Sequence, residues 1–90
     1  MIRRRIVVHG KVQGVFFRET ARWAAEQHGV SGWVQNNDDG TVEAVFEGSE
    51  EAVAEAATVF EAGPPDAEVE RADVFEEEEP EKLRGFRVVM

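Results

Sequence analysis

Residues 9–19, HGKVQGVFFRE, combine residue types that suit the binding of an anion. Gly10 and Gly14 lie four residues apart, and Arg18 follows the second glycine by four. Glycines let consecutive backbone N–H groups turn toward one point. Where such a loop leaves a strand and enters a helix, the first N–H groups of the helix lack internal partners and carry partial positive charge. The stretch therefore predicts an anion site.

The anion that fits this pattern is a tetrahedral one. The N–H groups from about Gln13 to Arg18 would surround it, and the Arg18 guanidinium would add a charged, two-pronged donor. Charge-assisted hydrogen bonds contribute about 1.5–3 kcal/mol each, so a few of them outweigh repulsion from scattered surface acids. The spacing is neither that of a P-loop nor G-x-G-x-x-G. On spacing alone, a glycine-rich turn with a solvated Arg18 fits at least as well.

The flanking patterns predict the elements that hold this loop. Alternating apolar residues predict strands over 2–9, 30–36, 41–48 and 67–75, and a short strand over 85–90. Helical spacing of apolar residues predicts helices over 17–29, with Gly29 as its stop, and over 50–62, with Ser49 as its cap. NDDG at 37–40 predicts a hairpin turn, and 76–82 a charged loop.

The expected order is β-α-β-β-α-β with one extra short strand. Two helices of about three turns cannot enclose a core alone, but they can cover one face of an antiparallel sheet. We therefore predict an α+β, ferredoxin-like two-layer sandwich that forms one domain over residues 1–90. Phe16 and Trp23 lie seven residues apart on the flank of the first helix, where we expect them to widen its buried stripe.

A second stretch, GVSGWVQNNDDGTVEA at 29–44, occurs in the same chain as GKVQGVFFR. Together they resemble the acylphosphatase family. That family carries a Gly-x-Val-Gln-Gly-Val-x-Phe-Arg signature and a Gly-Trp/Tyr-Val-x-Asn strand that runs into an Asp/Asn-Gly hairpin. Each motif alone is moderately specific, whereas the pair in a chain of 90 residues is highly specific. The resemblance covers the whole length.

The resemblance implies a role for each matching residue. Arg18 matches the arginine that binds the substrate phosphate. Asn36 matches the asparagine that holds the attacking water. The loop whose amides cradle the phosphate matches Gln13, Gly14, Val15, Phe16 and Phe17. The implied reaction turns an acyl phosphate and water into a carboxylate and inorganic phosphate, with no metal, cofactor or covalent intermediate.

Two alternatives remain open at this point. Ferredoxin-like domains also bind phosphate- or carboxylate-bearing metabolites without catalysis, and fold does not fix function. Asn36 favours the enzyme, because a binder needs no water-holding amide opposite the loop. A carbamoyl-phosphate-handling domain is a related variant. The acyl phosphate itself, a small metabolite or a phosphorylated aspartyl group on a protein, stays open.

We favour structural roles for the other polar and aromatic residues. His9 is expected to be structural or to tune the site, and His28 to pack on the core or cap the helix. Asp38 and Asp39 suit a hairpin turn better than a cation site. Packing in the core or on the sheet is expected for three aromatic residues, which could instead line a pocket for an aromatic acyl group: Trp23, Trp33 and Phe46. We expect EEEE at 76–79 to be solvated, and pairing with acids for Arg3, Arg4 and Arg5.

Composition excludes several function classes. The absence of Cys excludes disulfides, thiol catalysis and Cys-ligated zinc. A net charge of −9 argues against nucleic acid as a partner. No apolar run is long enough to span a membrane, and MIRRRIVVHG lacks the apolar stretch of a signal peptide, so we expect a cytoplasmic monomer. Lys occurs only twice, which favours adaptation to a salty cytoplasm over ordinary solubilising charge.

Overall fold

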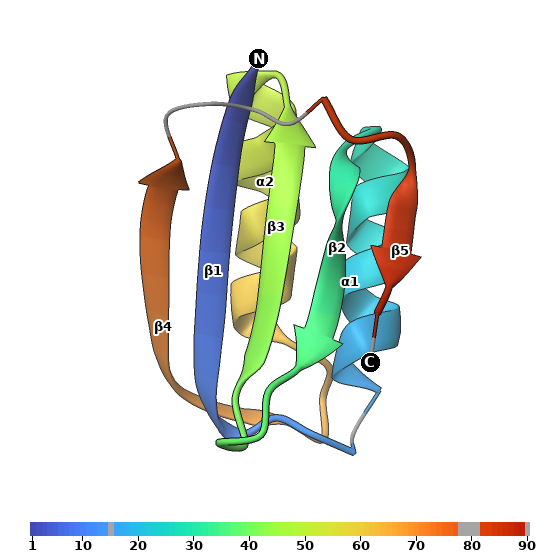
Figure 1. Ribbon diagram of the computed structural model, residues 1–90. Coiled ribbons are helices and arrows are strands. Elements are labelled where there is room, and N and C mark those ends of the chain that lie inside the picture. Colours follow the sequence, from blue (N-terminus) through green and yellow to red (C-terminus); the bar gives the residue numbers. More distant parts are fainter. Residues whose placement is uncertain (15, 78–81, 90) are drawn as a thin grey trace.

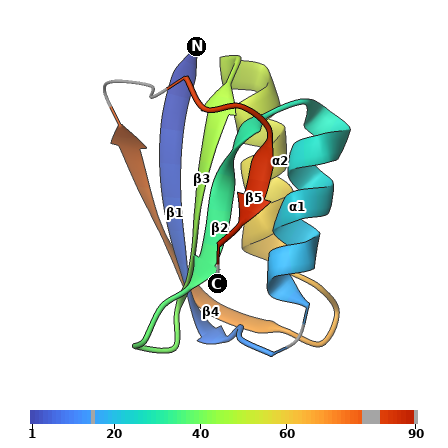
Figure 2. The same ribbon diagram turned by 45° about the vertical axis from the view of Figure 1, so that its right-hand side comes forward.

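The computed structural model describes residues 1–14, 16–77 and 82–89. These residues form two helices and five strands in the order β1 (Ile2–Lys11), α1 (Phe17–His28), β2 (Ser31–Asn36), β3 (Val42–Gly48), α2 (Glu50–Ala62), β4 (Glu68–Glu77) and β5 (Phe86–Val88). The strands make one sheet in the order β4-β1-β3-β2-β5, and both helices cover the same face of it (Figures 1 and 2). The predicted ferredoxin-like sandwich is confirmed.

The pairing of β5 departs in one detail from the expected antiparallel sheet. β1 pairs antiparallel with β3 and β4, and β2 pairs antiparallel with β3. β5 runs parallel to β2, so the sheet is mixed. β4 and β5 lie at opposite edges of the sheet (Figure 1). An alternating pattern in a short strand contains no information about the direction of β5.

Ion pairs with β1 extend β4 two residues beyond its predicted end. Glu76 and Glu77 belong to the strand and not to the predicted charged loop. Glu76 Oε1 lies 2.6 Å from Arg4 Nε, and Glu77 Oε1 lies 3.4 Å from Arg3 Nε. The prediction that Arg3, Arg4 and Arg5 pair with acids is therefore confirmed, since Arg5 also contacts an acid. Residues 78–81 and residue 90, which the predictions included, lie outside the described residues.

The core lies between the sheet and the two helices. Phe17 of α1 meets Phe60 of α2 edge to face at 5.2 Å between ring centroids, and Phe60 meets Phe46 of β3 at 5.8 Å. Around them pack the buried small and branched residues of the helices and inner strands: Ile6, Val8, Ala21, Ala24, Ala25, Val34, Ala44, Val53, Ala56 and Ala57. Neither described helix is both long and apolar enough to cross a bilayer.

The expectation that Phe16 and Trp23 widen the buried stripe of α1 is wrong. Their side chains are 77% and 55% exposed. The alanines of α1 let the helix approach the sheet closely, so the buried face is narrow and Trp23 falls outside it. Phe16 precedes the helix in a left-handed conformation and points away from the core. Phe46 is buried in the core, as expected.

The face of the sheet opposite the helices carries a network of charges. Trp33 lies there, half-buried, opposite Val45, because its neighbour Val34 faces the core. Arg5 Nη1 contacts a Glu43 oxygen at 3.3 Å, and His9 Nε2 contacts an Asp73 oxygen at 2.9 Å. These contacts fit the structural role expected for His9. His28 pairs with Glu55 of α2 at 2.9 Å, where we expected contact with the core or a cap.

Gly32 is predicted to be intolerant of any side chain. Its φ is +148°, and an added Cβ would collide with the backbone carbonyl oxygen of Val45 on β3. Since that carbonyl belongs to the sheet, relief requires breaking the β2–β3 pairing. We expect Gly32→Ala to lower the free energy of unfolding by about 3 kcal/mol or more, measured by urea denaturation.

Gly40→Ala is the matched control. Gly40 also has a positive φ, +93°, but no atom lies within 4 Å of an added Cβ. Only the backbone cost remains, on the order of 1–2 kcal/mol. Equal losses in the two variants would show that the close approach of β3 to Gly32 does not matter for stability.

Candidate functional site

The loop between β1 and α1 ends in an unusual helix start. Val12 is buried and anchors the loop, and Gly14 turns it with a φ of +75°. Phe16 takes the N-cap position of α1 with a φ of +64°, a conformation that bulky residues rarely adopt. Ser49 caps α2 by accepting a hydrogen bond from Ala52 N–H, whereas Phe16 has no side-chain acceptor to offer. No side chain at the N-cap therefore satisfies the first N–H groups of α1, and they are available to an anion.

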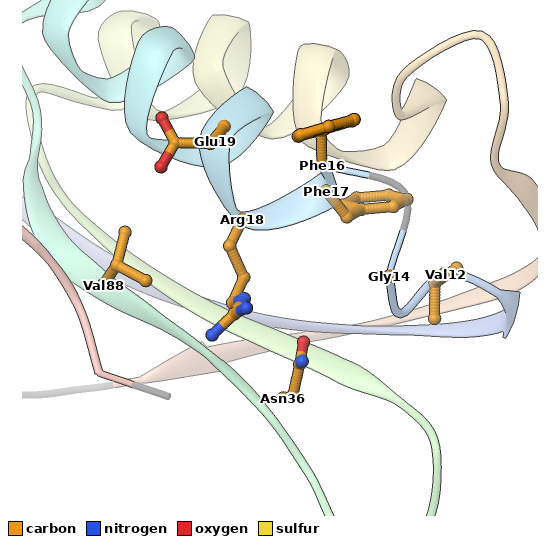
Figure 3. A pocket seen from close by; sticks show the side chains of 8 residues that line it. All are labelled: Val12, Gly14, Phe16, Phe17, Arg18, Glu19, Asn36 and Val88. Carbon is orange, nitrogen blue, oxygen red and sulfur yellow. The ribbon is translucent and has the colours of Figure 1, made fainter.

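A pocket of about 290 Å³ opens at this helix start (Figure 3). Five of the predicted site residues line it together: Gly14, Phe16, Phe17, Arg18 and Asn36. Three further described residues that were not predicted as site residues also line it: Val12, Glu19 and Val88. Val88 reaches the pocket because β5 pairs with β2, a contact that no local pattern indicates. Val15 lies outside the described residues.

Arg18 and Asn36 come from different elements and converge on this pocket. Arg18 lies in the first turn of α1. Asn36 ends β2, on the same side of the strand as the core residue Val34, and so faces the helices. In Figure 3 the guanidinium of Arg18 points toward the side-chain amide of Asn36. Neither side chain forms a hydrogen bond or ion pair with any other described residue. Both are therefore free to bind a ligand.

The neighbouring Asn37 is fully engaged. Its Nδ2 donates to Thr41 Oγ1 at 3.0 Å and to Glu43 Oε1 at 3.1 Å, while its Oδ1 accepts from Gln35 Nε2 at 2.9 Å. The two adjacent asparagines thus differ in kind, since Asn37 holds the hairpin together and Asn36 faces the pocket. Of the pair, only Asn36 has a side chain available for chemistry.

Gln13 holds the loop to the hairpin with its side chain. Its Nε2 donates to the backbone carbonyl oxygens of Asn37 at 2.8 Å and Thr41 at 2.9 Å. Gln13 does not line the pocket, although the sequence analysis placed it in the phosphate-binding loop. The sequence did not indicate this side-chain role, because the two acceptors are 24 and 28 residues away. These bonds fix the loop relative to the residue that follows Asn36.

The carboxylate of Asp39 stabilises the hairpin turn through hydrogen bonds. Asp39 Oδ1 accepts hydrogen bonds from Thr41 Oγ1 at 2.6 Å and from Thr41 N–H at 3.0 Å. These two bonds, the hydroxyl's first, lower the pKa of the Asp39 carboxyl from its ordinary value. Asp39 thus stabilises the turn, as expected.

The chemistry available in the pocket is electrostatic. Among the described lining residues there is no Ser, Thr, His or Lys to act as a nucleophile, and Glu19 is the one carboxylate. In Figure 3 the Glu19 carboxylate points away from both Arg18 and Asn36. No three His, Asp or Glu among the described residues cluster as metal ligands would. What the pocket offers is a cation, open N–H groups and a neutral amide.

Comparison with known proteins places this arrangement in a family. The chain is 54% identical over 84 residues to an acylphosphatase of Rubrobacter xylanophilus, covering 93% of this chain and 76% of that protein. It superposes on the crystal structure of an acylphosphatase from Bacillus subtilis with a TM-score of 0.95, at 37% identity over the full length of both chains. The acylphosphatase structure from Coxiella burnetii gives 0.90 at 38% identity, covering 98% of this chain and 92% of that one.

The match is not confined to the loop and the hairpin. The acylphosphatase family model aligns with residues 4–88, which contain all of the elements from β1 to β5 except the first two residues of β1. By sequence and by fold, this chain belongs to the acylphosphatase family.

Proposed function

We propose that this chain hydrolyses acyl phosphates in the pocket at the start of α1. The observation that carries the proposal is the convergence of two side chains without protein partners, Arg18 and Asn36, beneath a helix start that no N-cap side chain closes. Membership of the acylphosphatase family supplies the reaction class. A non-catalytic metabolite binder would account for Arg18 and the loop but not for Asn36.

The phosphoryl group would occupy the space between the loop and Arg18. The guanidinium and the open N–H groups of α1 would then stabilise the charge on its equatorial oxygens. The Asn36 amide would orient a water for in-line attack on phosphorus. Arg18 comes from α1 and Asn36 from β2, which suits a donor on one element and a held water on the other.

The reaction needs no acid catalyst. Water forms a new bond to phosphorus while the bond from phosphorus to the bridging oxygen breaks, and that oxygen leaves with the electron pair as a carboxylate. The proton of the water ends on the phosphate product or in solvent. A carboxylic acid has a pKa of about 4, so its anion leaves without being protonated. Metal-independent hydrolysis is therefore expected.

The decisive assay is hydrolysis of benzoyl phosphate in the presence of a metal chelator. Turnover by the wild type that is lost in Arg18→Ala would support the proposal. A folded wild type that binds phosphate without turnover would instead favour the metabolite binder.

We expect Arg18 and Asn36 to fail in different ways when truncated. Removing one preorganised donor costs about a hundred- to a thousandfold in rate. Asn36→Ala should keep its phosphate affinity and lose turnover by that factor. Arg18→Ala should lose both, because the charge that binds phosphate is gone. Phosphate titration and steady-state rates separate the two.

Arg22→Ala is the matched control for the loss of positive charge. Arg22 lies one turn further along α1, where it contacts Glu26 and not the pocket. Both its phosphate affinity and its turnover should stay near those of the wild type. Weakened phosphate binding in Asn36→Ala, equal to that in Arg18→Ala, would contradict the division of roles.

We also expect Gln13 to position the loop. Gln13→Ala removes two hydrogen bonds to the hairpin, each contributing about 0.5–1.5 kcal/mol to stability. Because a small displacement of a binding group can cost about a hundredfold in rate, we expect kcat/KM to fall roughly ten- to a hundredfold. The exposed Gln27 of α1 supplies the control Gln27→Ala, which should change neither quantity. Unchanged kcat/KM in a Gln13→Ala variant that has lost stability would show that the two bonds serve folding alone.

The acidic surface leads to a separate proposal about salt. Nineteen acids oppose ten basic residues, so the folded chain repels itself. We propose that the protein is adapted to high salt, and that raising potassium chloride from about 0.1 to 2 M raises Tm because the Debye length falls to about 3 Å near 1 M. Screening also weakens ion pairs such as Arg4–Glu76, so a fall in Tm would mean that these pairs outweigh the repulsion. The cytoplasmic location and monomeric state stay predictions.

A further inference from the structure

A second, open groove lies beside the phosphate pocket. Its volume is about 350 Å³, within the range of about 300–1,000 Å³ typical of small-molecule sites. It runs between α1 and the end of α2, with Phe16, Glu19, Thr20, Trp23, Val59, Gly63, Pro64 and Pro65 along its walls. Phe16 and Glu19 also line the phosphate pocket, so the groove and the pocket share a wall.

We propose that this groove binds the acyl portion of the substrate, and that it favours uncharged, aromatic or branched acyl groups. The proposal rests on the function proposed above and names the substrate class. It assigns Trp23 to substrate selection, in place of the packing role expected from the sequence. Trp23 lines the groove and not the phosphate pocket, so it would contact the acyl group alone.

The direction of in-line attack points the acyl group toward the groove. Entering and leaving oxygens lie on opposite sides of phosphorus. If Asn36 holds the water, the leaving carboxylate departs on the far side of the phosphoryl group from Asn36. In Figure 3, Phe16 lies at the start of α1, and Asn36 lies across the pocket on the strand. Phe16 is the residue at which the pocket continues into the groove.

The residues that line the groove are suited to binding an apolar group. Phe16 and Trp23 are among the few large apolar side chains that the described surface exposes by more than half. Burial of apolar surface by a ligand contributes roughly 25 cal/mol per Å² before the costs of binding. Trp23 and the two prolines would present flat, rigid surfaces to an aromatic ring. Continuity with the phosphate pocket favours part of the same small molecule over a separate protein partner.

We also expect Glu19 to make the groove selective for the charge of the acyl group. Glu19 lines both cavities, and its negative charge would repel an acyl group that carries a second carboxylate. The kcat/KM for 4-carboxybenzoyl phosphate should therefore be lower than that for benzoyl phosphate. The Glu19→Gln variant should show a smaller difference in kcat/KM between these two substrates.

The first test compares benzoyl phosphate with acetyl phosphate, which lacks a group large enough to reach the groove. Trp23→Ala should lower kcat/KM for benzoyl phosphate about tenfold, mainly through KM, and leave acetyl phosphate within twofold. The control is Phe75→Ala, which removes another exposed aromatic ring, on β4, away from both cavities. It should leave the ratio of the two kcat/KM values unchanged. If Trp23→Ala left the ratio of the two kcat/KM values unchanged while acetyl phosphate was still hydrolysed, the proposed acyl-binding role of the groove would be wrong. The proposed function would not be affected.

The second test measures binding without turnover. The chain has two tryptophans, so Trp33→Phe leaves Trp23 as the only one. Benzoylphosphonate, which cannot be hydrolysed, should shift the emission of Trp23, whereas acetylphosphonate should not. If the wild type hydrolyses neither acyl phosphate, the proposed function is wrong. The fluorescence emission of Trp23 then still tests whether the groove binds an aromatic acyl group. A shift with benzoylphosphonate alone supports it, and equal or absent responses to both probes overturn it.

Discussion

The edge-to-face contact between Phe17 and Phe60 is the constraint on which the site depends. Phe17 is the first residue of α1 and is almost completely buried, so the helix can begin in only one place relative to the core. Arg18 is the next residue, about 100° further around the helix, and so projects from the side of α1 toward the ends of the strands. The aromatic series continues through Phe46 to Phe86 of β5, stacked at 5.6 Å, which ties the pocket to the far edge of the sheet.

The candidate site is made of groups that the fold leaves without partners and of supports that are fully bonded. Asn36, Arg18 and the start of α1 have no described side-chain partner. Next to them, Gln13 and Asn37 use their side-chain amides to hold the loop and the hairpin in place. Phe16 adds strain, since a left-handed conformation costs a bulky residue on the order of 1–3 kcal/mol. Polar groups without partners and a strained backbone both lower stability, and proteins commonly keep such features at functional sites.

Local patterns predicted the element order well, because alternation, helical spacing and turn residues all act over short distances. The pairing of Arg18 with Asn36 came instead from the resemblance to the acylphosphatase family, and the fold brings the two together because a strand end and a helix start meet. The misses involve relations across the chain. The direction of β5, and with it the place of Val88, depends on a crossover that short-range patterns do not specify. The acceptors of Gln13 lie on a distant hairpin, and the ends of β4 depend on arginines of β1. The exposure of Phe16 follows from its left-handed conformation before α1, and that of Trp23 from the narrow, alanine-rich buried face of the helix.

The left-handed backbone at Phe16 has a consequence for how this protein can evolve. Gly or Asn would relieve the strain at this position, but either would remove the ring that lines both cavities. Stability and the proposed substrate contact would therefore favour different residues at this position, and a change to Gly or Asn would remove a wall that the two cavities share. Position 23 is under no such conflict, because Trp23 lies within a regular helix turn. If the groove binds the acyl group, substrate range can change at position 23 at a lower cost in backbone strain than at position 16.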